Sequence, residues 1–236
     1  MSKLIINKLI LTHKDKHLVD LINGQKPIEI KNSLALVGQS GSGKSLTLKT
    51  ILKMTPKELN VLFDYESDFT LDSNNIGFIP QNPFTSLSPM TKIYKQFFCD
   101  NQKIDDLLKL VKIDLDLKNK FPLELSGGQL QRIVIAIALS KNPRLLLLDE
   151  PTTALDEINK SIVLNIIKEL QKKMNFILIF VSHDIESIKS VCDEIIILKD
   201  GKICEHGQTI EILTNPATDY TKMLIQSNFK NRKFRK

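Results

Sequence analysis

A glycine-rich segment between an apolar run and a helix-compatible run constrains this sequence more than any other feature. Residues 38–45 read Gly-Gln-Ser-Gly-Ser-Gly-Lys-Ser, which matches at every position the loop that wraps backbone N–H groups around nucleotide phosphates. The apolar run 34–37 precedes this loop and the segment 45–52 follows it, which is the strand, loop, helix context that the motif requires. The sequence therefore predicts a site for ATP or GTP.

The residue types of this loop predict how the nucleotide is held. The glycines permit positive φ and close backbone approach, and the helix that follows directs the positive end of its dipole at the phosphates. Lys44 is expected to reach the β and γ phosphates, and Ser45 to bind Mg²⁺. The predicted nucleotide-binding residues of this segment are Gly38, Gln39, Ser40, Gly41, Ser42, Gly43, Lys44, Ser45 and Leu46.

Length and composition exclude several classes of protein. The 236 residues suffice for a buried core, and no run approaches the ~18 apolar residues of a membrane span. The first residues lack the apolar stretch of a signal peptide, so export is not expected. Three cysteines without CxxC spacing, Cys99, Cys192 and Cys204, argue against a disulfide framework or a zinc site; we expect inert thiols in a reducing cytosol.

The positive charge of the chain is concentrated at its end. The net charge is +6, and the segment 226–236 accounts for most of it. We expect this segment to be a disordered basic tail, with contact to anionic lipid or to an acidic partner as the alternative, and we expect no nucleic-acid partner. Its basic residues are Lys230, Arg232, Lys233, Arg235 and Lys236.

The order of apolar runs predicts an α/β fold. Strands are expected at 4–11 and 28–37, broken by Asn23-Gly24, and a hairpin is expected at 195–203 around Asp200-Gly201. A strand, helix, strand unit implies a mostly parallel sheet. The remaining predicted segments are a strand at 76–81, an inserted helical pattern at 82–120, a helix from Ser126 to about 142, a strand at 145–149, a helix at 158–174 and a strand at 176–181.

Polar residues at the ends of the predicted strands supply the chemistry of ATP hydrolysis. Asp149 follows four leucines and can hold Mg²⁺ through its hydration shell, while the adjacent Glu150 can accept a proton from the attacking water or orient it. His183 ends the next strand and can donate a hydrogen bond to the γ phosphate. The alternative for the Asp-Glu pair is an acidic helix cap, which is the less common case even without the phosphate loop, whereas a single strand-end histidine is more often structural.

A second helix start is typical of an anion site. Leu125-Ser126-Gly127-Gly128-Gln129 places a serine and two glycines there, although the chain already has one phosphate loop. If both serve one nucleotide, geometry favours a second subunit that supplies one of them. The sequence thus predicts ATP held between two chains.

These residues resemble the ATP-binding cassette (ABC) family. The resemblance rests on Walker A at 38–45, the Q-loop Gln81, the signature 125–129, Walker B at 145–150, the D-loop 154–156 and the switch His183. It implies one ABC ATPase domain at 1–225, with a P-loop, RecA-like core, a small antiparallel β subdomain and a helical subdomain inserted at about 83–140. It also implies that the signature and Asp156 contact nucleotide bound by the opposing subunit, that Glu150, His183, Lys44 and Gln81 are catalytic, and that Ser45, Gln81 and Asp149 bind Mg²⁺.

Two further segments resemble the dipeptide, oligopeptide and nickel importer branch of this family. They are 81–89 and 214–221, although Ser88, Thr218 and Asp219 depart from that branch's usual residues. The resemblance favours nickel or another metal chelate over peptides. The aromatic residue that the family usually stacks on adenine has no counterpart before Phe63, so His13, or alternatively His17, is expected in that role.

The resemblance implies an ATPase subunit at the cytoplasmic face of a membrane. The expected partners are integral membrane permeases, a second identical or different ATPase subunit and, indirectly, an extracytoplasmic solute-binding protein. The expected cofactors are ATP and Mg²⁺. The alternatives are a soluble cassette ATPase acting on nucleic acid or ribosomes and the ATPase of an exporter. A P-loop kinase or GTPase does not account for the signature.

Overall fold

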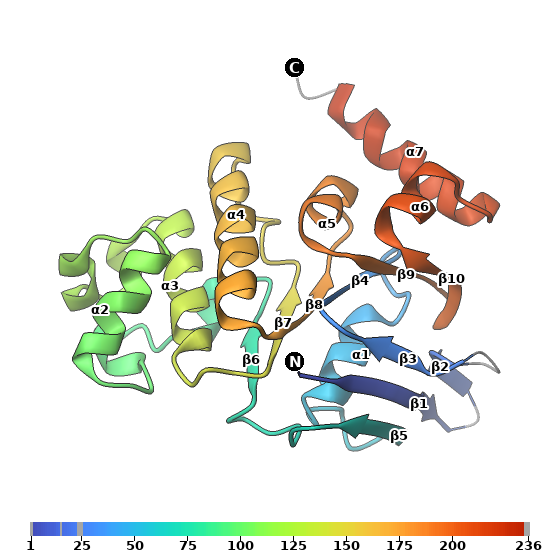
Figure 1. Ribbon diagram of the computed structural model, residues 1–236, viewed down its shortest axis with the longest axis horizontal. Helices are drawn as coiled ribbons and strands as arrows, with labels where there is room; N and C mark the ends of the chain where they lie inside the picture. The colour runs from blue at the N-terminus through green and yellow to red at the C-terminus, as the bar shows by residue number, and fades with distance from the viewer. Residues whose placement is uncertain (1, 15, 23–25, 234–236) are drawn as a thin grey trace. The chain divides into compact units, whose positions relative to one another are not determined.

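The computed structural model describes residues 2–14, 16–22 and 26–233 (Figure 1). The chain divides into two compact units, one formed by Met1–Leu71 with Ile177–Lys236 and the other by Asp72–Phe176. The predicted break at Asn23-Gly24 lies outside the described residues. Each unit is described by itself below.

Three buried parallel strands form the centre of the first unit. They are β4 (Ser33–Val37), β8 (Ile177–Val181) and β9 (Glu194–Lys199), and β4 pairs with both of the others. Their apolar side chains are buried on both faces, as is usual for parallel strands covered on two sides. This confirms the mostly parallel core that the apolar runs predicted.

The predicted hairpin follows β9 directly. β10 (Lys202–Gln208) pairs antiparallel with β9. Asp200 and Gly201 both have positive φ, 49° and 77°, which is what a two-residue type I′ turn requires. The Asp-Gly pair therefore sets the register of the hairpin.

The first segment of the chain forms the antiparallel part of this unit. β1 (Leu4–His13) pairs antiparallel with β2 (Lys16–Asp20), β3 (Ile28–Ile30) and β5 (Asn60–Ser67). The strand β5 was not predicted, because most of its side chains are exposed and it lacks the apolar alternation that marks a half-buried strand. Its backbone pairing with β1 determines its conformation.

Four helices complete the first unit. They are α1 (Lys44–Ile51), α5 (Ile185–Val191), α6 (Thr209–Thr214) and α7 (Asp219–Lys233), and α6 and α7 both contact β10 (Figure 1). Residues 226–233 continue α7, whereas 234–236 lie outside the described residues, so the predicted disorder of the segment 226–236 stays a prediction. Buried Thr221 and Leu224 anchor the first turns of α7, and each added helical residue then costs little.

The second unit contains two parallel strands and three α-helices. β6 (Ile76–Ile79) pairs with β7 (Leu145–Asp149). The helices are α2 (Asn101–Leu110), α3 (Gly127–Leu139) and α4 (Glu157–Met174), and α3 contacts both of the others and β6 (Figure 1). The core strand, the serine-capped helix and the helix at 158–174 thus match their predictions.

The inserted segment is less regular than its sequence pattern suggested. Within 82–120 only α2 is an α-helix. Its other helical turns are the short 3₁₀ helices η1 (Pro83–Ser86), η2 (Ile93–Gln96) and η3 (Leu115–Asn119). A fourth 3₁₀ helix, η4 (Pro122–Glu124), begins just after the segment. Prolines at the starts of η1 and η4 fix φ but remove a backbone donor, which favours short turns over long helices.

Candidate functional site

The glycines of the phosphate loop serve the two purposes predicted for them. Gly41 and Gly43 have φ of 82° and 102°, and Gly43 caps the N-terminus of α1 without a side chain. Gly38 does not have positive φ and serves close backbone approach instead. A Cβ at Gly38 would lie 2.3 Å from the Leu198 carbonyl oxygen, so glycine is required there for close backbone approach.

The lysine of the loop is buried within the loop itself. Lys44 is 7% exposed, and its ammonium donates to the carbonyl oxygens of Gly38 at 2.8 Å and Gln39 at 2.9 Å. Ser45, next along α1, is exposed. The first turn of α1 contains no acidic residue, so its N-terminal dipole and the ammonium together favour an anion.

Two carboxylates lie at the C-terminal end of the buried strand β7 in the second unit. Asp149 and Glu150 are half-buried, and Glu150 has φ of 47°, a left-handed conformation that is rare outside glycine and clusters at functional sites. The Glu150 carboxylate accepts a hydrogen bond from the Thr153 hydroxyl at 3.1 Å. The pair does not cap a helix, because α4 begins at Glu157 with Asp156 as its cap.

The signature serine caps α3 in the manner predicted. The Gln129 N–H donates to Ser126 Oγ at 3.3 Å, and the Ser126 N–H donates to Gln129 Oε1 at 3.0 Å, which is a reciprocal capping box. Ser126 and Gly127 are exposed. The cap uses the serine oxygen as an acceptor, so its hydroxyl proton can be donated to an anion.

The second signature glycine packs against the helix that follows the D-loop. A Cβ at Gly128 would lie 2.5 Å from Asn159 Oδ1. Asn159 in turn donates from its backbone N–H and its side-chain amide to the Asp156 carboxylate, at 2.9 and 2.7 Å. The backbone hydrogen bond is the main reason why the pKa of Asp156 lies below its ordinary value. The signature and the D-loop are therefore linked through Asn159.

This close approach predicts unequal effects for the two signature glycines. Gly128→Ala should lower the free energy of unfolding by about 1–3 kcal/mol, because the added methyl displaces Asn159 from Asp156. Gly127→Ala is the matched control: no atom lies within 4 Å of its added Cβ, so its effect should stay within about 0.5 kcal/mol. Urea unfolding of the full chain measures both, and equal stability of the two variants would contradict the packing argument.

The remaining predicted site residues lie at exposed strand ends. Gln81 follows β6 and His183 follows β8, and both side chains are exposed, as are His13 and His17 around the β1–β2 turn. Their predicted contacts with nucleotide and Mg²⁺ stay predictions. The phosphate loop and His183 belong to the first unit, whereas Gln81, the signature and Asp149-Glu150 belong to the second.

A pocket in the second unit brings three of the predicted motifs together. Its volume is about 400 Å³, and it is lined by Gln81, the signature Gly127 and the D-loop Leu155, among others. Gln131 also lines it; this side chain is 1% exposed and its Nε2 has no hydrogen-bond partner. No sequence pattern indicated Gln131, because a glutamine inside a helix is usually solvated.

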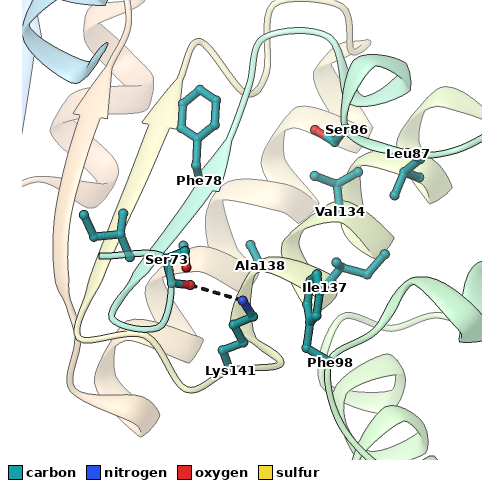
Figure 2. Close-up of a pocket in the computed structure, with 11 residues that line it drawn as sticks. Ser73, Phe78, Ser86, Leu87, Phe98, Val134, Ile137, Ala138 and Lys141 are labelled. Atoms are coloured by element: carbon teal, nitrogen blue, oxygen red, sulfur yellow. Dashed lines mark hydrogen bonds between the residues drawn. The ribbon is translucent and has the colours of Figure 1, made fainter. Parts of the chain in front are cut away.

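A second pocket of the same unit lies between β6 and α3 (Figure 2). Its volume is about 280 Å³. The Lys141 ammonium donates to the Ser73 carbonyl oxygen at 3.3 Å, a hydrogen bond that Figure 2 marks with a dashed line, and Phe98 and Ile137 both line the pocket. The Lys141 ammonium lies 4.3 Å from the centre of the Phe98 ring, a cation–π contact with a ring that is 64% exposed.

Other classes of site were sought among residues 2–14, 16–22 and 26–233. Over these ranges no group of three or more His, Cys, Asp or Glu side chains has the arrangement of a metal site, and no helix has the length and hydropathy to cross a bilayer. Burial raises the pKa of the Cys192 thiol. It also raises the pKa of the Cys99 thiol, which is less completely buried. Both shifts agree with the expectation of inert thiols.

Comparison with known proteins identifies the family. Residues 27–153 match the family described as ABC transporter. The chain belongs to this family. This ABC protein is 32% identical to the metal-staphylopine import system ATP-binding protein CntD of Staphylococcus aureus, over 98% of its own length and 94% of that protein. It is 39% identical to the oligopeptide transport ATP-binding protein OppD of Bacillus subtilis, over 83% of its length and 62% of that protein.

Solved structures agree on the fold. The structure of cbiO1 from Clostridium perfringens, part of the ABC transporter complex cbiONQ, matches 98% of this ABC protein with a TM-score of 0.74 and 26% identity. A bacterial Atm1-family ABC exporter with ATP bound matches with a TM-score of 0.75 and 23% identity, over 42% of that chain, which shows the fold alone. The predicted family, fold class and ATPase class are thus confirmed, and the relatives named above are ATP-binding proteins of oligopeptide transport and of metal-staphylopine import.

Proposed function

We propose that this ABC ATPase drives an importer for metal chelates or short peptides, from the cytoplasmic face of the membrane. The observation that carries the proposal is the match to the staphylopine importer subunit, which extends over 98% of this chain and 94% of the relative. The chain spans only 62% of the oligopeptide relative. The segments 81–89 and 214–221 support the importer branch, and the match to the staphylopine relative favours a nickel-type or other metal chelate as cargo, delivered by an extracytoplasmic solute-binding protein.

ATP binding is assigned to the loop at 38–45. The amides at the start of α1 and the Lys44 ammonium supply positive charge where the phosphates would bind. Oxygen donors at Ser45, Gln81 and Asp149 suit Mg²⁺, which prefers hard oxygen ligands, and the bound ion would neutralise charge on the phosphates. His13 is the proposed stacking partner of the adenine.

Hydrolysis is assigned to two strand-end side chains. Glu150 accepts a proton from the attacking water or orients it, and the hydrogen bond from Thr153 together with the left-handed backbone restricts where its carboxylate can point. His183 donates a hydrogen bond to the γ phosphate, so that its position depends on whether that phosphate is present.

The signature is assigned to nucleotide bound by a second ATPase subunit, identical to this chain or different from it. Exposed Ser126 and Gly127 at the start of α3 support this assignment, because a helix N-terminus with a serine hydroxyl favours an anion. ATP binding would then close the two subunits, since these contacts form only in the closed state.

The pocket beside Phe98 is assigned to a cytoplasmic helix of a membrane subunit. Its walls are largely apolar and include Leu87, Val134 and Ile137 (Figure 2). The exposed Phe98 ring at its edge is the kind of aromatic anchor that dominates interface energies. A movement of the inserted segment would thereby displace the permease helix that is bound in this pocket.

Co-purification tests the proposal and this pocket together. A tagged chain, purified in detergent from the membranes of its native cells, should retain integral membrane subunits. Phe98→Ala should reduce that recovery at least about tenfold, while ATP affinity stays unchanged. The matched control is Phe121→Ala, a second exposed aromatic of the same unit that lines neither pocket.

Two results would contradict the proposal. Recovery of the tagged chain with ribosomes or nucleic acid, and without membrane subunits, would favour the soluble class of cassette ATPases. Equal losses for Phe98→Ala and Phe121→Ala would remove the assignment of the pocket and leave the importer assignment intact.

A further inference from the structure

The hydroxyl of Tyr220 connects the C-terminal helix to the phosphate loop. The Gln39 N–H donates to Tyr220 Oη at 3.2 Å, and the Tyr220 hydroxyl donates to the Leu198 carbonyl oxygen at 3.3 Å. One side chain of α7 thus joins the start of the loop to the end of β9. All of these residues belong to the first unit.

The peptide group that donates to Tyr220 lies between Gly38 and Gln39, and its carbonyl oxygen, that of Gly38, accepts from the Lys44 ammonium at 2.8 Å. The Gln39 carbonyl accepts from the Lys44 ammonium at 2.9 Å and from the Ser42 N–H at 3.1 Å. The Gly38 backbone packs on the same Leu198 carbonyl to which Tyr220 donates. A shift of the tyrosine hydroxyl would therefore displace the first two residues of the loop and, through their carbonyl oxygens, the Lys44 ammonium.

The start of α7 is itself fixed on β10. The Thr218 N–H donates to the Glu205 carboxylate, and Thr218 Oγ1 lies 2.9 Å from Thr221 Oγ1 and 3.3 Å from Cys204 Sγ. Burial raises the pKa of Glu205, but the hydrogen bonds from Thr218 and Thr221 together outweigh this effect. The pKa therefore lies below its ordinary value. The carboxylate is therefore charged near neutral pH and strengthens these bonds.

The ring of Tyr220 is held as well as its hydroxyl. The Lys199 ammonium lies 5.2 Å from the ring centre, which is within cation–π range. Lys199 directly follows Leu198 at the end of β9. The ring and the hydroxyl therefore have separate partners at one strand end, which restricts the side chain to few positions.

We propose that Tyr220 is a positioning residue for ATP binding, which holds the Gln39 peptide so that the phosphate loop and Lys44 are pre-arranged for the phosphates. This inference rests on ATP binding at the loop. A pre-arranged loop gives up less conformational freedom when the nucleotide binds. By reciprocity, bound ATP should stabilise the docking of α7 on β10 by the same factor.

Removal of the hydroxyl alone tests this role. In the full chain, Tyr220→Phe should raise both the Kd of Mg·ATP and the KM for ATP by about three- to tenfold, the range expected for one hydrogen bond. The kcat should change less than about twofold, because Tyr220 contacts no reacting atom. Titration calorimetry and steady-state hydrolysis measure these constants.

The control is a tyrosine of the same unit that lies elsewhere. Tyr65 of β5 stacks on Phe63 at 4.9 Å, and Tyr65→Phe should leave Kd, KM and kcat unchanged. A readout specific to positioning is amide exchange: Mg·ATP should slow exchange at 219–228 in the native chain and in Tyr65→Phe, and should do so less in Tyr220→Phe.

The outcomes separate this inference from the proposed function. If the native chain does not bind ATP, the proposed function is overturned together with the positioning role of Tyr220. If the native chain binds ATP and Tyr220→Phe binds it equally well, with the same protection of 219–228, only the positioning role is overturned and the contact merely anchors α7. A loss that Tyr65→Phe shares would overturn it as well.

Discussion

Glu150→Gln is expected to reduce ATP hydrolysis by at least about 100-fold, the usual contribution of a general base, while leaving the affinity for ATP within about threefold. Glutamine keeps the shape of the side chain and its hydrogen bond with Thr153 but cannot accept the proton of the attacking water. Phosphate release under saturating ATP measures the rate, and calorimetry measures the affinity.

The matched control for this variant is Glu157→Gln. Glu157 lies in the first turn of α4 and its side chain is 80% exposed, so its replacement should leave hydrolysis unchanged. The assignment of Glu150 as the base is contradicted if Glu150→Gln retains brisk turnover, or if Glu157→Gln loses as much.

Lys44→Ala is expected to weaken ATP binding by about 10- to 100-fold, which corresponds to the loss of charge-assisted hydrogen bonds to the phosphates. The same change also removes the ammonium that bonds the Gly38 and Gln39 carbonyls, so the loop itself should lose order. Calorimetric titration with Mg·ATP measures the change in Kd.

A lysine of the same helix provides the comparison. Lys49 lies in the last turn of α1 and is exposed, and Lys49→Ala should bind ATP as the native chain does. If Lys44→Ala binds with native affinity, the phosphates do not bind at this loop.

The parts of the fold that were predicted correctly depend on neighbouring residues. The run at 145–148 predicts a strand because four consecutive apolar side chains must be buried, and Asp200-Gly201 predicts its turn because both residues tolerate positive φ. The strand β5 depends on its pairing with β1, which lies elsewhere in the chain. Local patterns do not contain that information, so this strand was missed.

The same distinction separates the site residues that sequence predicts from those it misses. The phosphate loop, the signature cap and Asp149-Glu150 are contiguous motifs, and their local geometry follows from their own residues. Tyr220 contacts Gln39 across 181 residues of sequence, and the unpaired amide of Gln131 depends on how α3 is buried. Gly38 is a third case. Its residue type predicted a close backbone approach, but the group that approaches it is the carbonyl oxygen of Leu198, which lies far away in the sequence.

A structure of the Glu150→Gln variant with Mg·ATP, assembled with its membrane subunits, tests directly whether two subunits share each nucleotide. We expect two facing ATPase subunits, with Ser126 of this chain within hydrogen-bonding distance of a γ phosphate bound by the phosphate loop of the opposing subunit. A structure with ATP in both phosphate loops and Ser126 distant from every triphosphate would contradict this expectation.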